Sequence, residues 1–323
     1  MAMREIGGYF GCEFAPGSEY YPELIPLNSG RNALWYVLEA RKINRLYVPY
    51  YLCDSISMMC ENKGFNFVYY HIGEDFLPSF SGSLRPDEYI LIVNYFGTLS
   101  DNIIRKLREQ YINIILDNTQ AFFVRPVSNV DTIYSCRKFF GVSDGAYLST
   151  SIRLQRKLKR DMSRDRLRHI FGRFEENAGS YYSCFRENES LIDDLELRAM
   201  SAVTHNMLRA IDYNKVINTR NANAALLALR FREVNRLDNL QLSEAPFAYP
   251  LYIEKGAAVR KRLACEGIYI PTLWPNVLYS GANIMEKDYA ENILPLPCDQ
   301  RYTSEDMEYL SDRILMVMKN LSN

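Results

Sequence analysis

The chain has 323 residues, of which 48% are hydrophobic and 24% are charged, and its formal net charge is −1. This composition suffices for a large buried core, and the length predicts one large domain with a smaller one attached. The balanced charge argues against nucleic acid or a membrane as the principal partner. A cytoplasmic location is expected, because no apolar run of about eighteen residues occurs and residues 1–6 lack the pattern of a signal peptide.

Cysteine and histidine spacing predicts no metal site. The seven cysteines form no Cys-x-x-Cys pair, and the three histidines lie far apart in the sequence. Neither a zinc site nor a disulfide framework is therefore expected, and the cysteines are interpreted as reduced thiols.

Helical and strand patterns alternate in the first half of the chain, which indicates a mostly parallel sheet. We expect helices at residues 30–40, 55–62 and 102–110. We expect strands at residues 45–49, 65–70, 89–93, 112–116, 131–135 and 146–149. The helix that begins at Gly30 offers free backbone amides and the positive end of its dipole, which favour a phosphate group.

The second half of the chain predicts a helical connector and then a small α/β domain. Residues 152–232 are expected to form long helices. The basic part of this region, 153–173, either attracts a diphosphate or is the solvated face of a helix whose apolar residues, Leu154, Leu158 and Met162, point inward. In the small domain we expect strands at 247–253 and 268–271 and helices at 256–266 and 303–321, the last of which begins at a Thr303 or Ser304 cap.

Two residues carry the strongest chemical signal. Asp117 ends a short apolar strand, the position at which open α/β sheets bind ligands. Lys138 follows 21 residues later, between Ser135 and aromatic residues. A carboxylate can keep a pyridine nitrogen protonated, and a lysine can bind an aldehyde carbon and then carry protons. The pair therefore favours a pyridoxal-phosphate (PLP) site.

With their neighbours, these residues resemble the sugar aminotransferases of the DegT/DnrJ/EryC1/StrS family, which are PLP enzymes of the aspartate-aminotransferase fold. The segment 27–34 is similar to the family's Ser-Gly-Thr-x-Ala-Leu turn, and 116–121 is similar to its Glu-Asp-Ala-Ala-Gln-Ala motif. Other segments agree in order and spacing, namely 47–51, 92–97, 267–269, 273–275 and 293–297. The resemblance implies an α/β protein of PLP fold type I, with a large PLP-binding domain at 1–220 that includes the connector and a small domain at 221–323.

The resemblance also implies roles for individual residues. Lys138 binds the cofactor aldehyde, Asp117 faces the ring nitrogen, and Gln120 lies near the ring oxygen. The phosphate is expected at Ser29, Gly30, Arg31 and Ser135. Tyr95 and Trp274 are expected to approach the substrate, although a buried structural position is the alternative for Trp274.

The chain departs from the family pattern at four places. Ser135 and Lys138 are three residues apart where the family has five, and Arg31 replaces a threonine, which adds a guanidinium near the phosphate. The residue that stacks on the ring aligns with Cys53, so that Tyr51 or its neighbour Tyr50 either stacks instead or is simply buried. The family's Asn-Tyr-Arg signature is not recognisable in residues 193–202.

The sequence therefore predicts a PLP-dependent aminotransferase that moves an amino group, with glutamate as the expected donor, to a nucleotide-linked keto-sugar in polysaccharide or amino-sugar biosynthesis. A homodimer is expected, because members of the family build each site at a subunit interface. Two alternatives stay open. One is a dehydratase-like outcome, although the family's dehydratases replace the lysine with histidine. The other is a degenerate protein that binds a sugar nucleotide or a partner without turnover.

Overall fold

An eight-stranded sheet forms the centre of the large domain. The computed structural model describes residues 6–237 and 241–322. The strands lie in the order β1-β8-β7-β6-β5-β2-β3-β4. Their bounds are β1 (Ile25–Leu27), β2 (Arg45–Pro49), β3 (Phe67–Ile72), β4 (Pro78–Ser79), β5 (Glu88–Val93), β6 (Ile114–Asp117), β7 (Asp131–Ser135) and β8 (Ala146–Ser149). The neighbours among β2, β3, β5, β6 and β7 pair in parallel, whereas β1, β4 and β8 are antiparallel to theirs. The predicted parallel sheet is confirmed.

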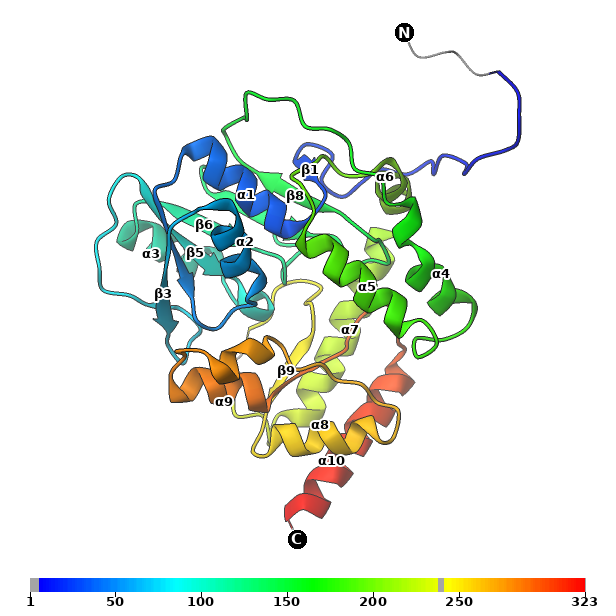
Figure 1. Cartoon of the computed structure of the whole chain (residues 1–323). Coiled ribbons are helices and arrows are strands. Elements are labelled where there is room, and N and C mark those ends of the chain that lie inside the picture. Colours follow the sequence, from blue (N-terminus) through cyan, green and yellow to red (C-terminus); the bar gives the residue numbers. More distant parts are fainter. Residues whose placement is uncertain (1–5, 238–240, 323) are drawn as a thin grey trace.

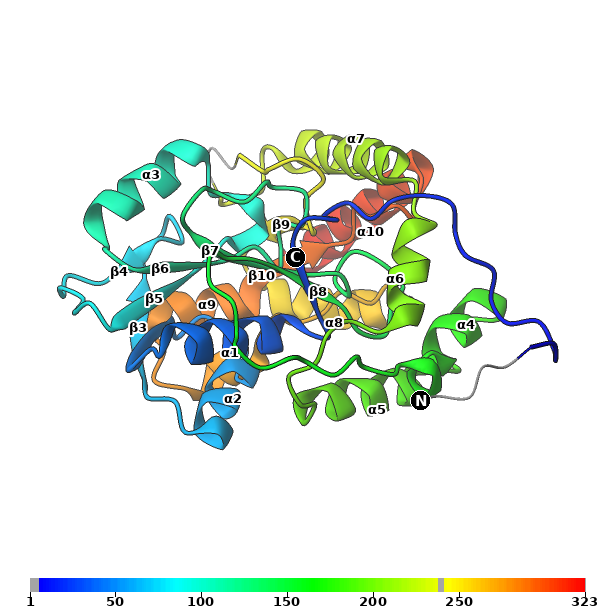
Figure 2. The same cartoon turned by 90° about the horizontal axis from the view of Figure 1, so that it is seen from above.

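Helices cover both faces of this sheet. α1 (Gly30–Arg41) and α2 (Ser55–Lys63) lie on one side of it, and α3 (Asp101–Gln110) lies on the other (Figures 1 and 2). The side chains of Ser29 and Ser100 cap α1 and α3 by accepting backbone N–H groups of the first turn. A short 3-10 helix, η1 (Tyr95–Gly97), follows β5. The α/β class that the alternating pattern predicts is confirmed.

The region that follows β8 corrects one prediction. The helices here are η2 (Arg164–Arg166), α4 (Arg168–Glu175), α5 (Tyr182–Asp193), α6 (Ala202–Arg209) and α7 (Tyr213–Phe231). The predicted basic helix does not form over 152–163, which runs without helix along the domain. Leu154 and Leu158 pack on the core as predicted, but Met162 is 66% exposed. Like charges three and four residues apart, repeated along this segment, repel one another in a helix, and this explains the difference.

The small domain is built on a two-stranded antiparallel sheet. The strands are β9 (Tyr249–Tyr252) and β10 (Ile293–Leu296), and the helices are α8 (Gly256–Ala264), η3 (Pro275–Tyr279), α9 (Ile284–Asn292) and α10 (Ser304–Ser322). Thr303 caps α10 through its Oγ1, which accepts the N–H of Asp306, as predicted. The predicted strand at 268–271 is wrong, because β10 takes the place beside β9 and Tyr269 is 77% exposed.

α7 links the two domains. Val216, in its first half, packs in the large-domain cluster around Tyr21 and Phe122, whereas Leu227 and Phe231, in its second half, belong to the core of the small domain. The predicted boundary at residue 220 falls inside this helix. A single helix therefore fixes both domains to each other over its length.

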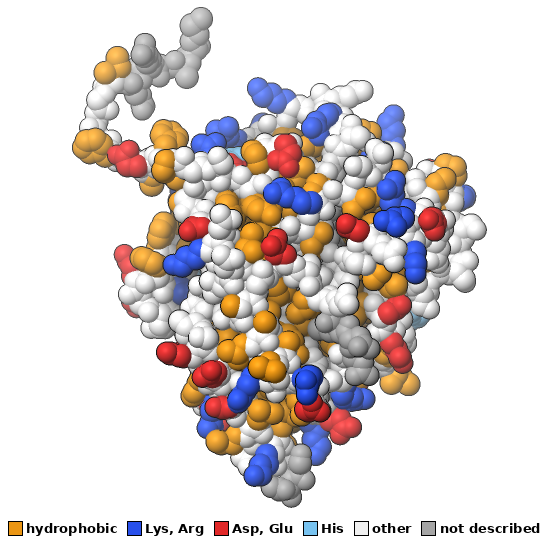
Figure 3. Space-filling model, turned by 180° about the vertical axis from the view of Figure 1, so that it is seen from behind, with side chains coloured by type: hydrophobic (Ala, Val, Ile, Leu, Met, Phe, Trp, Pro, Cys, Tyr) orange, Lys and Arg blue, Asp and Glu red, His pale blue; other side chains and the backbone are white. Residues whose placement is uncertain are grey.

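Acidic and basic side chains are interspersed on the face that Figure 3 shows. The N-terminal segment extends from the domains (Figures 1 and 3), and the side chains of Ile6, Tyr9, Phe10 and Phe14 are exposed. Within residues 6–237 and 241–322, no helix is long and apolar enough to cross a membrane, and no cluster of three or more His, Cys, Asp or Glu could hold a metal ion.

Replacement of Phe231 by alanine tests the core of the small domain. Phe231 is fully buried, so Phe231→Ala should lower the free energy of unfolding by about 3–5 kcal/mol in urea denaturation. Leu229, in the same helix, is 72% exposed, and Leu229→Ala should change stability by less than about 0.5 kcal/mol. Equal effects of the two substitutions would contradict this packing.

Candidate active site

The site lies at the carboxyl edge of the parallel strands. Asp117 is the last residue of β6, and Ser135 is the last residue of the adjacent β7. Because β6 and β7 are parallel, both strands deliver these residues to the same edge. Lys138 follows three residues after Ser135, in a turn held by the carbonyl of Cys136, which accepts the N–H groups of Phe139 and Phe140.

Thr119 joins the carboxylate to the lysine. The Oδ1 of Asp117 accepts the backbone N–H of Thr119 at 2.8 Å. The Nζ of Lys138 donates to the Oγ1 of Thr119 at 3.3 Å. Asp117 is 4% exposed and so is fixed beneath the edge of the sheet. The structure therefore brings the predicted carboxylate and the predicted lysine into one cluster.

Lys138 is both reachable and surrounded. Its side chain is exposed to solvent, yet protein surrounds the amine on most sides, and the ring of Phe247 lies 5.8 Å from Nζ. This desolvation lowers the pKa of Lys138, while the charges of Asp117 and Cys53 oppose the shift. The solvent contact limits the size of the shift. A lysine of lowered pKa has a larger neutral, nucleophilic fraction near pH 7.

The amino end of α1 lies against this cluster. A Cβ atom added at Gly30 would come within 3.3 Å of Thr119 Cγ2 and 3.8 Å of Ser135 Cβ. The glycine therefore leaves a gap that opens onto backbone amides at the positive end of the helix dipole, which suits a phosphate group. The hydroxyl of Ser29 is already used as the cap of α1, where it accepts the N–H of Asn32 at 3.1 Å.

The side chain of Arg31 does not point freely into this gap. Its guanidinium donates to the carbonyl of Ile192 at 3.0 Å and pairs with Asp193 at 2.6 Å, both at the end of α5. In this structure the guanidinium, which was expected beside the phosphate, therefore contacts α5.

Gln120 is buried beside the end of β5. Its Oε1 accepts the N–H of Phe96 at 2.8 Å, whereas its Nε2 is buried without a hydrogen-bond partner among the described residues. Buried donors normally have partners. An unpaired amide donor and the gap at Gly30 together fit a cofactor that brings a ring oxygen and a phosphate.

Three aromatic residues predicted at the site are buried instead. Tyr51 is 1% exposed and meets Trp274 edge to face, with ring centroids 4.8 Å apart. The hydroxyl of Tyr95 donates to the carbonyl of Tyr51 at 2.6 Å. This cluster joins the large domain to the segment before η3, so Tyr51 is not placed to stack on a ring, and Trp274 takes the structural alternative. Cys53, in the same strand exit, is close enough to Lys138 to oppose the lowering of the Lys138 pKa.

Three important residues were not selected from the sequence. Thr119 lies within the strand-end motif, two residues after Asp117, and that spacing could have indicated it. Phe247 and Arg220 had no such signal, because an aromatic residue near a strand and an arginine in a helix are common. Arg220 is 2% exposed and donates to the carbonyls of Phe139 and Pro246, at 3.4 and 2.9 Å.

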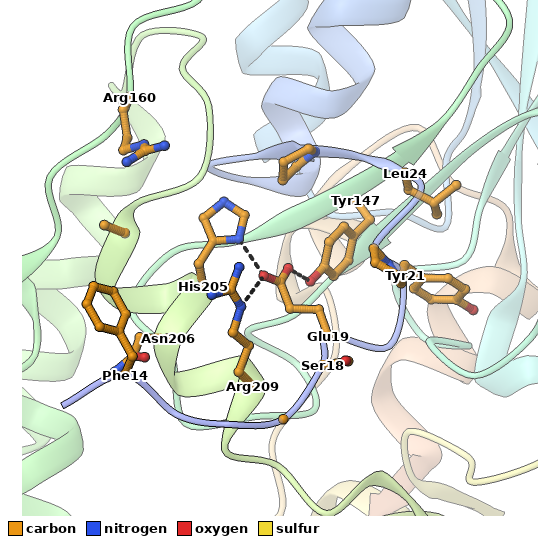
Figure 4. A pocket seen from close by; sticks show the side chains of 14 residues that line it. Phe14, Ser18, Glu19, Tyr21, Leu24, Tyr147, Arg160, His205, Asn206 and Arg209 are labelled. Atoms are coloured by element: carbon orange, nitrogen blue, oxygen red, sulfur yellow. Dashed lines mark hydrogen bonds and ion pairs between the residues drawn. The ribbon is translucent and has the colours of Figure 1, made fainter.

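A cavity of about 540 Å³ lies on another part of the large domain (Figure 4). None of the predicted site residues lines it. At its centre Glu19 accepts hydrogen bonds from Tyr147 at 2.5 Å and from His205 at 2.7 Å, and it pairs with Arg209 at 3.5 Å. These contacts fix the segment before β1 to α6, which gives the cluster a structural role.

Comparisons with known proteins identify the fold. No family model and no curated protein matches the sequence. Solved structures do match. The PLP form of Spr1654 from Streptococcus pneumoniae, described as a sugar aminotransferase, is 14% identical, with a TM-score of 0.65 over 95% of this chain and 88% of that one. The aminotransferase TlmJ from Streptoalloteichus hindustanus is 15% identical, with a TM-score of 0.65 over 93% and 86%. A DegT/DnrJ/EryC1/StrS aminotransferase from Brucella abortus is 15% identical, with a TM-score of 0.60 over 90% and 84%.

These similarities show that the chain has the fold of PLP-dependent aminotransferases, as the sequence predicts. Identities of 14 and 15% establish the fold and not the activity. The argument for activity therefore depends on the residues of the site.

The charge balance at Lys138 gives a first test of the site. Asp117 opposes the lowering of the Lys138 pKa, so Asp117→Asn should lower that pKa further. The pH dependence of acetylation at each lysine, followed by mass spectrometry, measures the effect. Lys106, an exposed lysine of α3, is the reference. A Lys138 that titrates like Lys106, or that titrates at higher pH in Asp117→Asn, would refute the proposed geometry.

The pH dependence of stability tests the Glu19 cluster. Burial raises the pKa of Glu19, but the hydrogen bonds from His205 and Tyr147 outweigh it, and the net pKa lies below 4.5. A lowered pKa stabilises the fold above about pH 4.5, and this contribution disappears as the pH falls through the folded-state value. Glu19→Gln should therefore lower the free energy of unfolding by about 1.5–3 kcal/mol at pH 7 in urea denaturation, and the difference from wild type should shrink below pH 4.5. Glu23→Gln, at an exposed position in the same segment, is the control and should match wild type throughout.

Proposed function

We propose that this protein is a PLP-dependent aminotransferase. The observation that carries the proposal is the joint placement of Asp117, Thr119 and Lys138 at one edge of the sheet, beside the free amino end of α1. A PLP cofactor needs a carboxylate, an amine and a phosphate seat, and these three features lie together here. Such a cofactor, when bound, supplies an aldehyde that condenses with amines and a ring that accepts electrons.

The residues of the chain then have distinct tasks. The Lys138 amine would hold the cofactor through its aldehyde, and the same Nζ atom, once released, would be the group that accepts and returns a proton. The buried carboxylate of Asp117 keeps the ring nitrogen protonated, and Thr119 holds both groups in register through its N–H and hydroxyl. The amides at Gly30, with the Ser135 hydroxyl, bind the phosphate. The unpaired Nε2 of Gln120 donates to the ring oxygen.

For the substrates we propose glutamate as amino donor and a nucleotide-linked keto-sugar as acceptor. The support for a sugar acceptor is the fold shared with the sugar aminotransferase Spr1654, together with the accessible side of Lys138. The nucleotide link and the glutamate donor come from the family resemblance of the sequence. We further propose that two copies of the chain assemble as a homodimer and act in the cytoplasm. The absence of the family's Asn-Tyr-Arg signature means that this chain would complete its site with other residues.

An absorption spectrum tests the proposal. Purified protein mixed with PLP should gain a band near the visible edge that is absent in Lys138→Ala, because only this lysine reaches the aldehyde. Glutamate should then shift the band. Asp117→Asn should keep the band and slow the shift by about a hundredfold, because the ring loses its proton.

Lys106→Ala serves as the matched control and should behave as wild type. A band that persists in Lys138→Ala, or none in the wild type, would disprove the enzymatic assignment. A normal band that does not respond to glutamate or to any other amino acid would favour a protein that binds the cofactor without turnover.

A further inference from the structure

Two arginines are sequence neighbours of the proposed phosphate and lysine positions, and the charge of a third acts on one of them. Arg31 directly follows Gly30, Arg137 directly precedes Lys138, and Arg166 ends η2. Their side chains are only 14, 19 and 8% exposed. Burial, together with the charges of Arg31 and Arg166, lowers the pKa of Arg137 to about 10, although the charges of Asp144 and Asp193 oppose the shift. Arg137 is therefore close enough to the other two guanidinium groups to be repelled by each.

Two of these arginines have counter-ions that can leave. Arg31 pairs with Asp193 and also donates to the backbone carbonyl of Ile192 at 3.0 Å, whereas Arg137 pairs with Glu189; all three partners are on α5. The two carboxylates are 48 and 42% exposed, so water can solvate them as soon as they turn away. Arg166 differs, because its partner Asp161 is only 3% exposed and lies 2.7 Å away.

The same region contains buried polar atoms without partners. Among the described residues, the Nε atoms of Arg31 and Arg166, the Oγ of Ser143, the Oδ1 of Asn188 and the Oε1 of Glu189 make no hydrogen bond, although the last of these forms the ion pair with Arg137. Ser143 and Asn188 are 0 and 2% exposed, and the Nδ2 of Asn188 donates to the Ser143 carbonyl at 3.4 Å. Buried polar groups normally have partners. The two Nε atoms can only donate, the Ser143 hydroxyl can donate or accept, and the oxygens of Asn188 and Glu189 can only accept, so Arg31 and Ser143 still have a donor available to an anion.

We propose that Arg31 and Arg137 form an anion site, adjoining the α1 amides, for the cofactor phosphate, and that Glu189 and Asp193 are resident counter-ions which the phosphate displaces. The inference rests on the proposed function. A phosphate accepts two parallel hydrogen bonds from one guanidinium, and its charge is greater than that of either carboxylate. Once the phosphate takes over, α5 loses its ion pairs to α1 and to the lysine turn, so α5 is held less firmly.

Titrations with two aldehydes test the anion site. PLP and pyridoxal differ only by the phosphate group, and both can react with Lys138. Arg31→Gln and Arg137→Gln should weaken PLP binding by about tenfold to a hundredfold, as expected for lost charge-assisted hydrogen bonds, and leave pyridoxal binding unchanged. Arg156→Gln removes a guanidinium that pairs with Glu39 on α1 and should leave both affinities unchanged. Glu189→Gln, which removes a competitor, should bind PLP at least as tightly as wild type.

The outcomes separate this inference from the proposed function. Equal loss of affinity for both aldehydes in the arginine variants, or no loss for either, overturns the anion site while the enzyme assignment stands. If the wild type binds neither aldehyde, the proposed function fails, and the anion site is then tested by itself with inorganic phosphate. At constant ionic strength, phosphate should raise the melting temperature of the wild type but not of the Arg31→Gln/Arg137→Gln double variant, and it should speed hydrogen exchange in residues 182–193. The same response in both proteins would overturn the site.

Inorganic phosphate also separates the cofactor from a phosphorylated substrate as the source of the anion. In the PLP-loaded wild type the arginines should already be occupied, so added phosphate should change neither the melting temperature nor the exchange of α5. A stabilisation that persists with PLP bound, and that disappears in the double variant, would assign the arginines to a substrate phosphate and overturn the cofactor assignment.

Discussion

The arrangement of the two domains depends on the buried guanidinium of Arg220. This side chain is 2% exposed and reaches three separate parts of the chain: the carbonyl of Phe139 in the lysine turn, the carbonyls of Pro246 and Phe247, and the Oε1 of Gln300 after β10. A buried charge is costly unless every donor is used, so these contacts have to be kept together. The contacts fix the segment that carries Phe247, and the ring of Phe247 in turn lies over Lys138. The chemistry of the lysine therefore depends on a contact made between domains.

The parallel sheet determines where the carboxylate of the site lies. Asp117 and Ser135 come from adjacent parallel strands, so they reach the same edge without any special loop. Thr119, which is only two residues after Asp117, connects Asp117 to Lys138 through its N–H group and its hydroxyl. The gap at Gly30 lies on the same edge because α1 crosses β7 and β8. Residues near the ends of adjacent strands thus form most of the proposed site, and long-range packing adds the remaining residues, such as Phe247.

This division explains how much could be predicted from the sequence. The patterns that set β2, β7 and β8 are local, and these strands have the predicted bounds. The basic helix and the strand at 268–271 were wrong, because charge repulsion between neighbouring turns and the competing pairing of β10 override a local pattern. At the site, Asp117 and Lys138 could be found together since strand ends converge. The burial of Tyr51 against Trp274 could not, because it depends on a contact between residues more than two hundred positions apart.

The lysine turn is flanked by two arginines in opposite situations. Arg220 binds backbone carbonyls, which cannot leave, so its charge is committed to holding the fold. Arg137 binds Glu189, a side chain that is 42% exposed and can turn to solvent. A guanidinium with a replaceable partner is suited to a ligand, whereas one with fixed partners is suited to structure. The same residue type therefore serves both purposes beside the same turn, and the exposure of the partner distinguishes them.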